Sequence, residues 1–366
     1  MNYIEALNFM TKKQSLGIMP GLSRIIELLN DMGNPQDKLS IIHVAGTNGK
    51  GTVAGTIALA LMRAGYKVGL FTSPWVEDYR EQIQINSKPI GKTDFTDYVE
   101  KYRDNPCSEF EFLTAIMYKY FADSGVDFAV VECGLGGEED ATNVERKNLS
   151  VITSVSIDHT NFLGNTLEEI ALAKSGIIKE NCTCVLYPNA DTQAIFEEQC
   201  KRKNAALIKV EDRCDFNDNN LLTAKKAIEA IGFEANVTPV RLPARQEYIG
   251  GVLLDGGHNF SAAQGLAERL NDEVAVIGMM KDKDVDGYLS LVASRCRSII
   301  AVTPDNPRAL PASELAELAK RYCSDVKAVE NPLEAIRLAR ENGLSLVCGS
   351  FFLARQVRKE LSAYKK

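Results

Sequence analysis

The stretch HVAGTNGKGT at residues 43–52 constrains this chain more than any other part of the sequence. The apolar run at residues 41–44 predicts a short buried strand, and the apolar spacing over residues 53–63 predicts a helix directly after the stretch. Glycines at such a junction let the backbone approach an anion, and the amino end of a helix attracts negative charge. The stretch therefore predicts a phosphate-binding loop.

Two side chains within the loop fit the same chemistry. Lys50 supplies a positive charge for the outer phosphates, and the Thr52 hydroxyl can reach a metal or a phosphate oxygen. The spacing departs from the common G-x-x-x-x-G-K-[ST] pattern, because an extra glycine separates this lysine from the threonine. A plain glycine-rich turn is the weaker alternative, since three glycines and a lysine meet at one strand-to-helix junction.

Composition narrows the class of protein. A chain of 366 residues with 45% hydrophobic and 25% charged residues is long enough for two globular domains. A net charge of -7 argues against a nucleic-acid binder, and no apolar run approaches the about 18 residues of a membrane span. The start of the chain lacks a signal-peptide pattern, and the 9 cysteines form no C-x-x-C pair. We expect a cytoplasmic protein with free, buried thiols that binds neither nucleic acid nor membrane.

Apolar strands alternate with amphipathic helices along the chain, which predicts a mostly parallel sheet covered on both faces. A polar loop is expected at residues 212–220, and a proline-containing linker at residues 237–245. A second strand–helix series follows the linker. We therefore expect an α/β chain with a larger domain at residues 1–240 and a smaller C-terminal α/β domain at residues 241–366. The further strands expected in the larger domain are 67–71, 82–86, 127–132, 149–157 and 182–187.

Polar residues follow several of the predicted strands, at the edge where ligands bind in parallel sheets. Glu132 ends an apolar strand, where a buried carboxylate needs a partner, and a magnesium ion, an ion pair or a helix end can each supply one. Ser73 and His159 are weak signals when each is taken alone. Their coincidence with Glu132 and the glycine-rich loop at one edge is the stronger indication of a site.

Three further positions carry open interpretations. Lys174 follows a predicted helix cap at Thr166, and its pattern is that of a solvated helical lysine. The DGGHN stretch at residues 255–259 lies at a strand-to-helix junction of the second series, and its glycines indicate close approach to a ligand. His258 lies in that stretch, whereas His43 lies inside the first predicted strand and is expected in the core.

Eight motifs recur in a fixed order along nearly the whole chain: HVAGTNGKGT at 43–52, TSP at 72–74, VVECGLGG-x-x-DATN at 130–143, SIDHT-x-x-LG at 156–164, AKSGIIK at 173–179, DGGHN at 255–259, VIGMMKDKD at 276–284 and VCGSF at 347–351. This ordered set resembles the folylpolyglutamate synthase/dihydrofolate synthase family within the Mur-ligase superfamily. The resemblance implies a Mur-ligase-like fold, with a larger P-loop sheet domain and a smaller C-terminal α/β domain.

The resemblance also implies a reaction. ATP phosphorylates a substrate carboxylate, and the amine of L-glutamate attacks the resulting acyl phosphate to form an amide. The implied ligands are ATP, one or two magnesium ions, L-glutamate and a folate-type acid, and the implied oligomeric state is a monomer. Charge that builds on the transferred phosphoryl group would be stabilised by fixed donors and metal ions.

Motif matching assigns each implied role to residues of this sequence. The implied phosphate loop is Gly46, Thr47, Asn48, Gly49, Lys50, Gly51 and Thr52. Ser73 and Glu132 match ligands of one magnesium, Glu132 and His159 match ligands of a second, and Lys174 matches a lysine that is carbamylated in the family. Arg245, Asp255, His258 and Asn259 match groups that close over ATP, and Phe110 and Phe112 match an aromatic segment near the pterin. The implied catalytic residues are Lys50, His159, Lys174 and His258.

Several positions depart from the family pattern, mostly on the acceptor side. They are Trp75 for histidine, Gln82 for arginine, Glu138 for arginine, Ala173 for glutamate, and Asn219-Asn220 with Thr223 for a His-Gln pair and a following asparagine. These departures leave two alternatives beside a folate ligase. One is a Mur-superfamily ligase for a non-folate acid, and the other is a catalytically weak ATP-binding regulatory protein.

Overall fold

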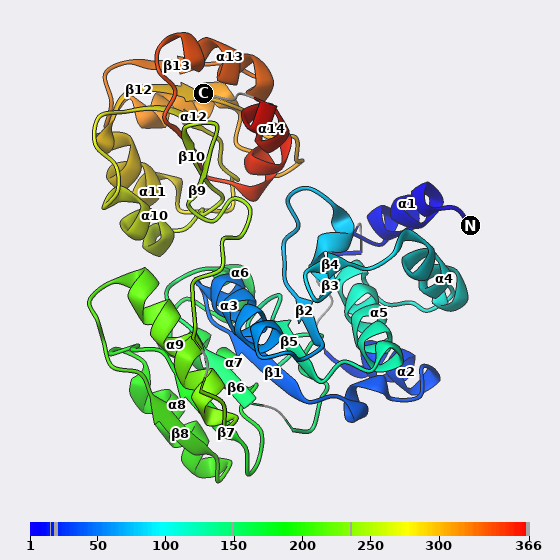
Figure 1. The fold of residues 1–366 in the computed structure, drawn as a ribbon. Coiled ribbons are helices and arrows are strands. Elements are labelled where there is room, and N and C mark those ends of the chain that lie inside the picture. Colours follow the sequence, from blue (N-terminus) through cyan, green and yellow to red (C-terminus); the bar gives the residue numbers. More distant parts are fainter. Residues whose placement is uncertain (15, 18–20, 148, 235, 364–366) are drawn as a thin grey trace. The chain divides into compact units, whose positions relative to one another are not determined.

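The computed structural model describes residues 1–14, 16–17, 21–147, 149–234 and 236–363, which form two compact units (Figure 1). The first unit comprises Met1–Ser73 and Tyr79–Val240, and the second comprises Pro74–Asp78 and Arg241–Lys366. The chain therefore crosses between the units after Ser73, after Asp78 and after Val240.

The first unit is built on an eight-stranded sheet with the order β4-β3-β2-β5-β1-β6-β7-β8. The strands from β2 to β8 in this order run parallel, and β3 and β4 add an antiparallel edge. The bounds are β1 Ile41–Ala45, β2 Val68–Phe71, β3 Ile83–Ile85, β4 Lys88–Pro89, β5 Phe128–Glu132, β6 Leu149–Ile152, β7 Thr183–Leu186 and β8 Ala206–Lys209.

Helices cover both faces of this sheet (Figure 1). Side chains alternate along a strand, so Ile42 and Val44 of β1 pack toward α3 and α9, whereas Ala45 packs in the cluster that includes α7 and α8. The helices are α1 Tyr3–Gln14, α2 Ser23–Asp31, α3 Lys50–Arg63, α4 Lys92–Tyr102, α5 Glu109–Ser124, α6 Thr160–Leu163, α7 Leu167–Ser175, α8 Gln193–Arg202 and α9 Phe216–Ala230, with 3-10 turns at Pro35–Lys38 and Tyr79–Gln82.

The second unit contains a six-stranded sheet with the order β13-β12-β11-β14-β10-β9, of which only the edge strand β9 is antiparallel. Helices α10 to α12 contribute to one buried cluster and α13 and α14 to another. The bounds are β9 Glu247–Ile249, β10 Val252–Asp255, α10 Phe260–Ala267, β11 Glu273–Ile277, α11 Val285–Val292, β12 Cys296–Ala301, α12 Ala312–Ala319, β13 Val326–Ala328, α13 Pro332–Glu341, β14 Leu346–Cys348 and α14 Phe351–Ala363, with a 3-10 turn at Ala293–Arg295. The predicted α/β class with two sheets is confirmed.

Two sequence-based boundaries are wrong for identifiable reasons. The polar stretch at residues 212–220 is not a loop throughout, because α9 begins at Phe216 after Asp215 accepts hydrogen bonds from two backbone N–H groups of its first turn. The strand expected at residues 149–157 ends at Ile152, because the hydroxyls of Thr153 and Ser154 bond to the carbonyl of Asn48. Polar side chains thus start helix α9 earlier than expected and end strand β6 earlier than expected.

The helix that carries Lys174 begins where the sequence predicts. Thr166 caps α7 in a reciprocal arrangement, in which its hydroxyl accepts from the Glu169 N–H and the Glu169 carboxylate accepts from the Thr166 N–H. The helix ends at Ser175, so Lys174 lies in its last turn.

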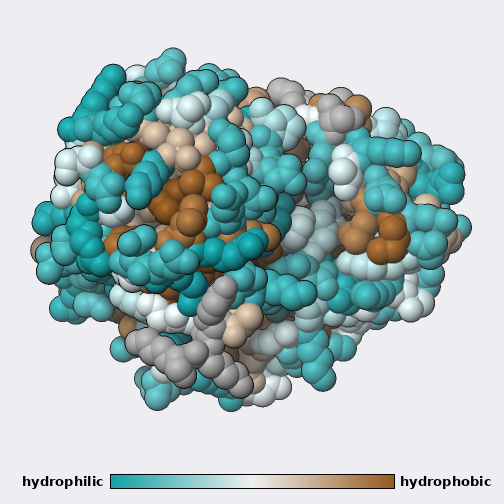
Figure 2. Space-filling view, turned by 90° about the horizontal axis from the view of Figure 1, so that it is seen from above, coloured by the Kyte–Doolittle hydropathy of each residue, from teal (hydrophilic) through white to brown (hydrophobic). Residues whose placement is uncertain are grey.

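One face of the surface is mostly hydrophilic. In the view of Figure 2 most side chains are hydrophilic, and apolar ones gather in separate patches. Among the described helices, none has the length and apolar character that crossing a bilayer requires. All nine cysteines are free, but Cys214 is exposed and two others are partly exposed, so the expectation of buried thiols holds for six of them.

The packing of β2 against α5 yields a stability prediction. A Cβ at Gly69 would lie 2.7 Å from the buried Phe121 ring, so Gly69→Ala overpacks this interface and lowers the free energy of unfolding by about 1–3 kcal/mol. Chemical denaturation measures the change. Gly265→Ala in α10 is the control, because no atom lies within 4 Å of that Cβ, and an equal loss in both variants would contradict the overpacking.

Candidate functional site

The loop between β1 and α3 is held close to its neighbours. Gly46 has φ +153, and a Cβ there would lie 1.8 Å from the Thr153 hydroxyl oxygen. Gly49 directly precedes the first residue of α3 and has φ +85. A Cβ there would lie only 2.5 Å from the Asn220 side-chain oxygen. Only glycine fits both conformations, and the predicted strand-to-helix loop is therefore present.

The segment after β6 fixes the loop from one side. The Thr47 N–H donates to the Ser154 carbonyl at 2.6 Å, and the Thr153 hydroxyl donates to the Asn48 carbonyl at 2.8 Å. The Thr47 hydroxyl also donates to the Ser156 carbonyl at 3.0 Å. These bonds hold the loop backbone in one shape.

The loop fits a phosphate-bearing nucleotide. The Lys50 ammonium donates to the carbonyls of Gly46 and Thr47 at 3.2 Å, which keeps its charge at the amino end of α3. Asn220 of α9 is 2% exposed, and neither polar atom of its amide has a partner within the described chain. A buried amide without a partner is costly, so this side of Gly49 suits a group that forms hydrogen bonds.

Glu132 ends β5 beside this loop. It pairs in register with Val44 of β1, is 2% exposed, and accepts a hydrogen bond from the Ser73 N–H at 3.0 Å. Ser73 lies two residues beyond β2, the neighbouring strand. A buried carboxylate beside a serine fits the oxygen ligands of magnesium, so these residues suit the predicted metal.

His159 follows the Ser156 segment that contacts the loop. It has φ +53, an unusual value for a residue other than glycine, and its side chain is 42% exposed. Its Nε2 lies 3.9 Å from a carboxylate oxygen of Asp158. The imidazole is therefore partly exposed to solvent and has a neighbouring anion.

Lys174 is not a surface lysine. It is 2% exposed, and its ammonium donates to the Gly46 carbonyl at 3.0 Å, so the solvated-helix interpretation is wrong. Burial, together with the charge of Lys50, lowers the pKa of Lys174 to about 7, although Asp158 and Asp140 oppose the shift. A helical pattern could not reveal this, because the loop that covers the lysine lies far away in the sequence.

The glycine-rich turn after β5 joins Glu132 to α7. The Glu138 N–H donates to the Ala173 carbonyl at 2.8 Å, and a Cβ at Gly137 would lie 2.9 Å from the Lys174 carbonyl. Asp140 organises the turn by accepting from the Leu135 N–H at 2.6 Å. Asp140 was not singled out from the sequence, although the DATN motif contained it.

His43 is buried as predicted, but in a polar cluster that the sequence did not indicate. Its Nδ1 lies 2.9 Å from Glu145, and its Nε2 lies 2.8 Å from the Thr142 hydroxyl and 3.0 Å from the Cys133 sulfur. Burial disfavours the charged imidazole, yet Cys133 and Glu145 outweigh it and raise the pKa of His43 to about 10. Cys133 adjoins Glu132, so this cluster supports the strand end that bears the candidate metal ligand.

In the second unit, Asp255 ends β10 at a similar junction. Its carboxylate accepts from the Gly257 N–H at 2.8 Å and the Gln246 N–H at 2.9 Å. Burial nevertheless raises the pKa of Asp255. The Arg245 guanidinium lies 4.0 Å from the ring centre of Phe351.

The same junction carries the other predicted residues of this unit. His258 Nδ1 lies 3.1 Å from the Gly256 carbonyl, and Asn259 caps α10 by accepting from the Ala262 N–H at 2.9 Å. The four predicted residues of the second unit, including Arg245 and Asp255, thus lie around the carboxyl end of β10.

The two predicted aromatic contacts differ in exposure. Phe110 is partly exposed, packs against Phe71 with ring centres 5.9 Å apart, and lies over Gly134, where a Cβ would come within 2.5 Å of its ring. Phe112 is fully buried and meets Phe9 edge-on, which suits the core better than a stacking surface.

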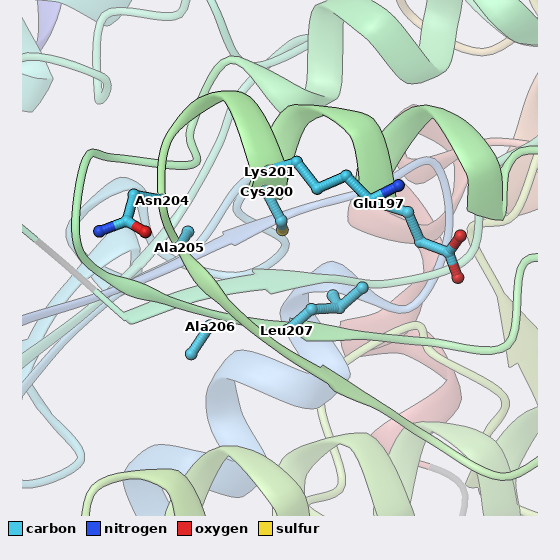
Figure 3. A pocket seen from close by; sticks show the side chains of 7 residues that line it. All are labelled: Glu197, Cys200, Lys201, Asn204, Ala205, Ala206 and Leu207. Atoms are coloured by element: carbon cyan, nitrogen blue, oxygen red, sulfur yellow. The ribbon is translucent and has the colours of Figure 1, made fainter.

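A pocket elsewhere in the first unit has no part in this site. Figure 3 shows it lined by residues of α8, of the turn after α8 and of the start of β8: Glu197, Cys200, Lys201, Asn204, Ala205, Ala206 and Leu207. It therefore lies at the amino end of β8, whereas the glycine loop lies at the carboxyl ends of the parallel strands.

Comparison with known proteins agrees with this arrangement. The Mur ligase middle domain model matches residues 44–230, and the Mur ligase, glutamate ligase domain model matches residues 241–351. A dihydrofolate synthase/folylpolyglutamate synthase of Bacillus subtilis is 32% identical over 98% of this chain and 99% of its own length. The chain belongs to the folylpolyglutamate synthase/dihydrofolate synthase family of Mur ligases.

Solved structures of the family share the fold. FolC of Escherichia coli in complex with DHPP and ADP superposes with a TM-score of 0.89 at 25% identity, covering 99% of this chain and 98% of that one. Mycobacterium tuberculosis folylpolyglutamate synthase complexed with ADP gives a TM-score of 0.86 at 27% identity, covering 97% of this chain and 99% of that one. The folylpolyglutamate synthase-like fold of this chain therefore extends over both units.

The burial of Lys174 yields a pH prediction. Its pKa is near 10.5 in the unfolded chain and about 7 in the fold, so between these values the unfolded state binds more protons. The cost of burying the charge is complete below pH 7 and is relieved as the pH rises toward 10.5. In buffer free of carbon dioxide, the free energy of unfolding of the wild type should therefore rise with pH relative to Lys174→Met. A constant difference from pH 6 to pH 10 would contradict a lowered pKa.

Proposed function

We propose that this chain is an ATP-dependent ligase that joins L-glutamate to a folate-type acid through an acyl phosphate. The contact that best supports this function is the bond from the buried Lys174 ammonium to Gly46, since it brings a lysine that can lose its charge onto the phosphate loop. The names of the relatives, dihydrofolate synthase and folylpolyglutamate synthase, support the acid and the reaction class.

The first unit supplies the groups that act on the nucleotide. Gly46, Thr47, Asn48, Gly49, Lys50, Gly51 and Thr52 hold its phosphates, and Lys50 offsets the charge of the group being transferred. Ser73 and Glu132 hold one magnesium ion, and Glu132 and His159 hold a second. Bound magnesium supplies charge neutralisation at the phosphoryl oxygens.

The order of the two steps follows from the chemistry of carboxylic acids. A carboxylate oxygen is a poor leaving group, so it first attacks the terminal phosphorus of ATP and releases ADP. The neutral amine of L-glutamate then attacks the acyl carbon, the C–O bond to phosphate breaks, and the amine loses a proton as the amide forms. Exclusion of water protects the acyl phosphate from hydrolysis.

We also propose that Lys174 is carbamylated. Its low pKa leaves a large neutral fraction at pH 7, and a neutral amine adds to the carbon of carbon dioxide with release of a proton. The product is an anion beside the loop, which can help hold the second metal ion and removes the repulsion from Lys50.

The second unit completes the assignment. We place the ATP-binding domain at residues 1–240, apart from the Pro74–Asp78 segment, and the closing domain at residues 241–366. In the closing domain, Arg245, Asp255, His258 and Asn259 contact the nucleotide and His258 acts in catalysis. Phe110 provides an aromatic face for a flat heterocycle, whereas the fully buried Phe112 supports the same helix from the core. The proposed working state is a monomer.

A substrate panel tests the function. Phosphate release is measured with magnesium, ATP and L-glutamate plus tetrahydrofolate, dihydropteroate or no acid, and we expect release that needs both glutamate and one of the two acids. Lys50→Ala should lower the rate at least about 100-fold while the circular dichroism spectrum stays unchanged. Release only with another acid would favour a non-folate ligase, and release with no acid tested would favour a regulatory ATP-binding protein.

The carbamate has its own test. Lys174→Ala should be inactive, and short carboxylic acids such as acetate should restore part of its activity by supplying the missing anion. The rate is measured against acetate concentration, with chloride at equal ionic strength as the control. Full activity of Lys174→Ala without added acid would contradict the carbamate.

A further inference from the structure

Five residues within the first unit's stretch of sequence belong structurally to the second. Pro74–Asp78 pack with the second unit, although Ser73 and Tyr79 on either side belong to the first. Val76 is 4% exposed and lies in a core cluster with side chains of β10 and α14. The segment is therefore part of the second unit's core, not a loop on its surface.

Trp75 anchors the segment to α14 by two contacts with one side chain. The Arg355 guanidinium lies 3.4 Å from the centre of the indole ring, and its Nη2 donates to the Trp75 carbonyl at 2.9 Å. A cation stacked on an aromatic face attracts its quadrupole, and the hydrogen bond fixes the backbone at the same residue. Arg355 therefore restrains both the ring and the main chain of Trp75.

One turn further along α14, Arg358 joins this segment to the linker between the units. It donates to Glu77 and, through Nη2 at 2.6 Å and Nε at 2.9 Å, to Glu247. Glu247 in turn accepts from the Ala244 N–H at 3.0 Å. Arg358 of α14 thus holds the inserted segment through Glu77 and the end of the linker through Glu247.

Ser73 is the residue directly before this anchored segment. Its N–H donates to Glu132, and Pro74 restricts the backbone of Ser73 to extended conformations. Ser73 is joined by a peptide bond to the anchored segment, so the restraint on the backbone at Pro74 and Trp75 also limits the conformations open to Ser73.

We propose that Arg355 is a positioning residue, which acts through Trp75 to hold Ser73 in place for the metal that Ser73 and Glu132 bind. The proposal rests on the proposed function only in taking these two residues as metal ligands. The Arg355 contacts described above are with Trp75, so its expected effect falls on metal affinity before it falls on the rate.

Three measurements separate this role from simple stabilisation. Trp75 is the only tryptophan of the chain, so its fluorescence reports whether the segment is anchored. Binding of Mn²⁺ in the presence of ADP, followed by electron paramagnetic resonance, reports the metal site without catalysis. ADP affinity in EDTA reports the phosphate loop alone.

We expect Arg355→Ala to shift the tryptophan emission to longer wavelength and to weaken Mn²⁺ binding at least about tenfold, with ADP affinity in EDTA within about twofold of the wild type. Lys359→Ala is the matched control, because Lys359 is an exposed cation of the same helix, and it should change none of these values. Arg355→Lys keeps the charge but loses the planar stack, and it should give an intermediate loss. If Arg355→Ala fails to fold, the same measurements on Arg355→Lys test the proposal.

Each outcome bears on a different claim. A released tryptophan with unchanged Mn²⁺ affinity overturns the positioning role and leaves the proposed function standing. If Arg355→Ala lowers ADP affinity in EDTA as much as it lowers Mn²⁺ affinity, the positioning role is also overturned, because the substitution would then disturb the phosphate loop as well as the metal site. A wild type that binds ADP but no Mn²⁺ overturns both the proposed metal ligands and this role.

Discussion

The lack of space for a side chain at Gly46 is the constraint on which the proposed site of the first unit depends. Thr153 leaves no room for a Cβ there, and Lys174 donates to the Gly46 carbonyl from the opposite element, α7. The Asn220 side chain of α9 likewise leaves no room for a Cβ at Gly49. Residues from distant parts of the sequence therefore converge on four consecutive loop residues, which fixes the shape of the loop that we propose as the phosphate site.

This convergence produces an uneven distribution of charge. Two lysines, Lys50 and Lys174, lie close enough for one to lower the pKa of the other, while Glu132 is buried one strand away. Placing two positive charges close together and burying a carboxylate costs folding free energy. Such an arrangement is expected at a site where bound ligands supply the opposite charges. The buried His43 and Glu145 pair differs, because its charges offset each other within the protein and support the strand end from behind.

Local pattern was sufficient for part of this architecture. The glycine-rich strand-to-helix loop, the α/β class, the Thr166 cap and the buried His43 follow from periodicity and from turn chemistry, which involve neighbours in sequence. The helical pattern alone would place Lys174 on the surface, and only the family resemblance pointed to the site, because a loop distant in sequence covers the lysine. The expectation of a loop at residues 212–220 failed because a single capping carboxylate starts α9 within it. The exchange of Pro74–Asp78 into the second unit leaves no local trace at all, since the α14 residue that bonds to Trp75 lies 280 positions later in the chain.

That exchange also limits how the protein can be divided. A fragment that starts at Arg241 would lack Val76, and the second unit would keep a hole in its interior worth roughly 2 kcal/mol of lost burial. The complementary fragment would expose Trp75 and Val76 to solvent. The two halves of this polypeptide are thus not interchangeable modules, and recombination with a relative's C-terminal half would succeed only if the five-residue segment travelled with it.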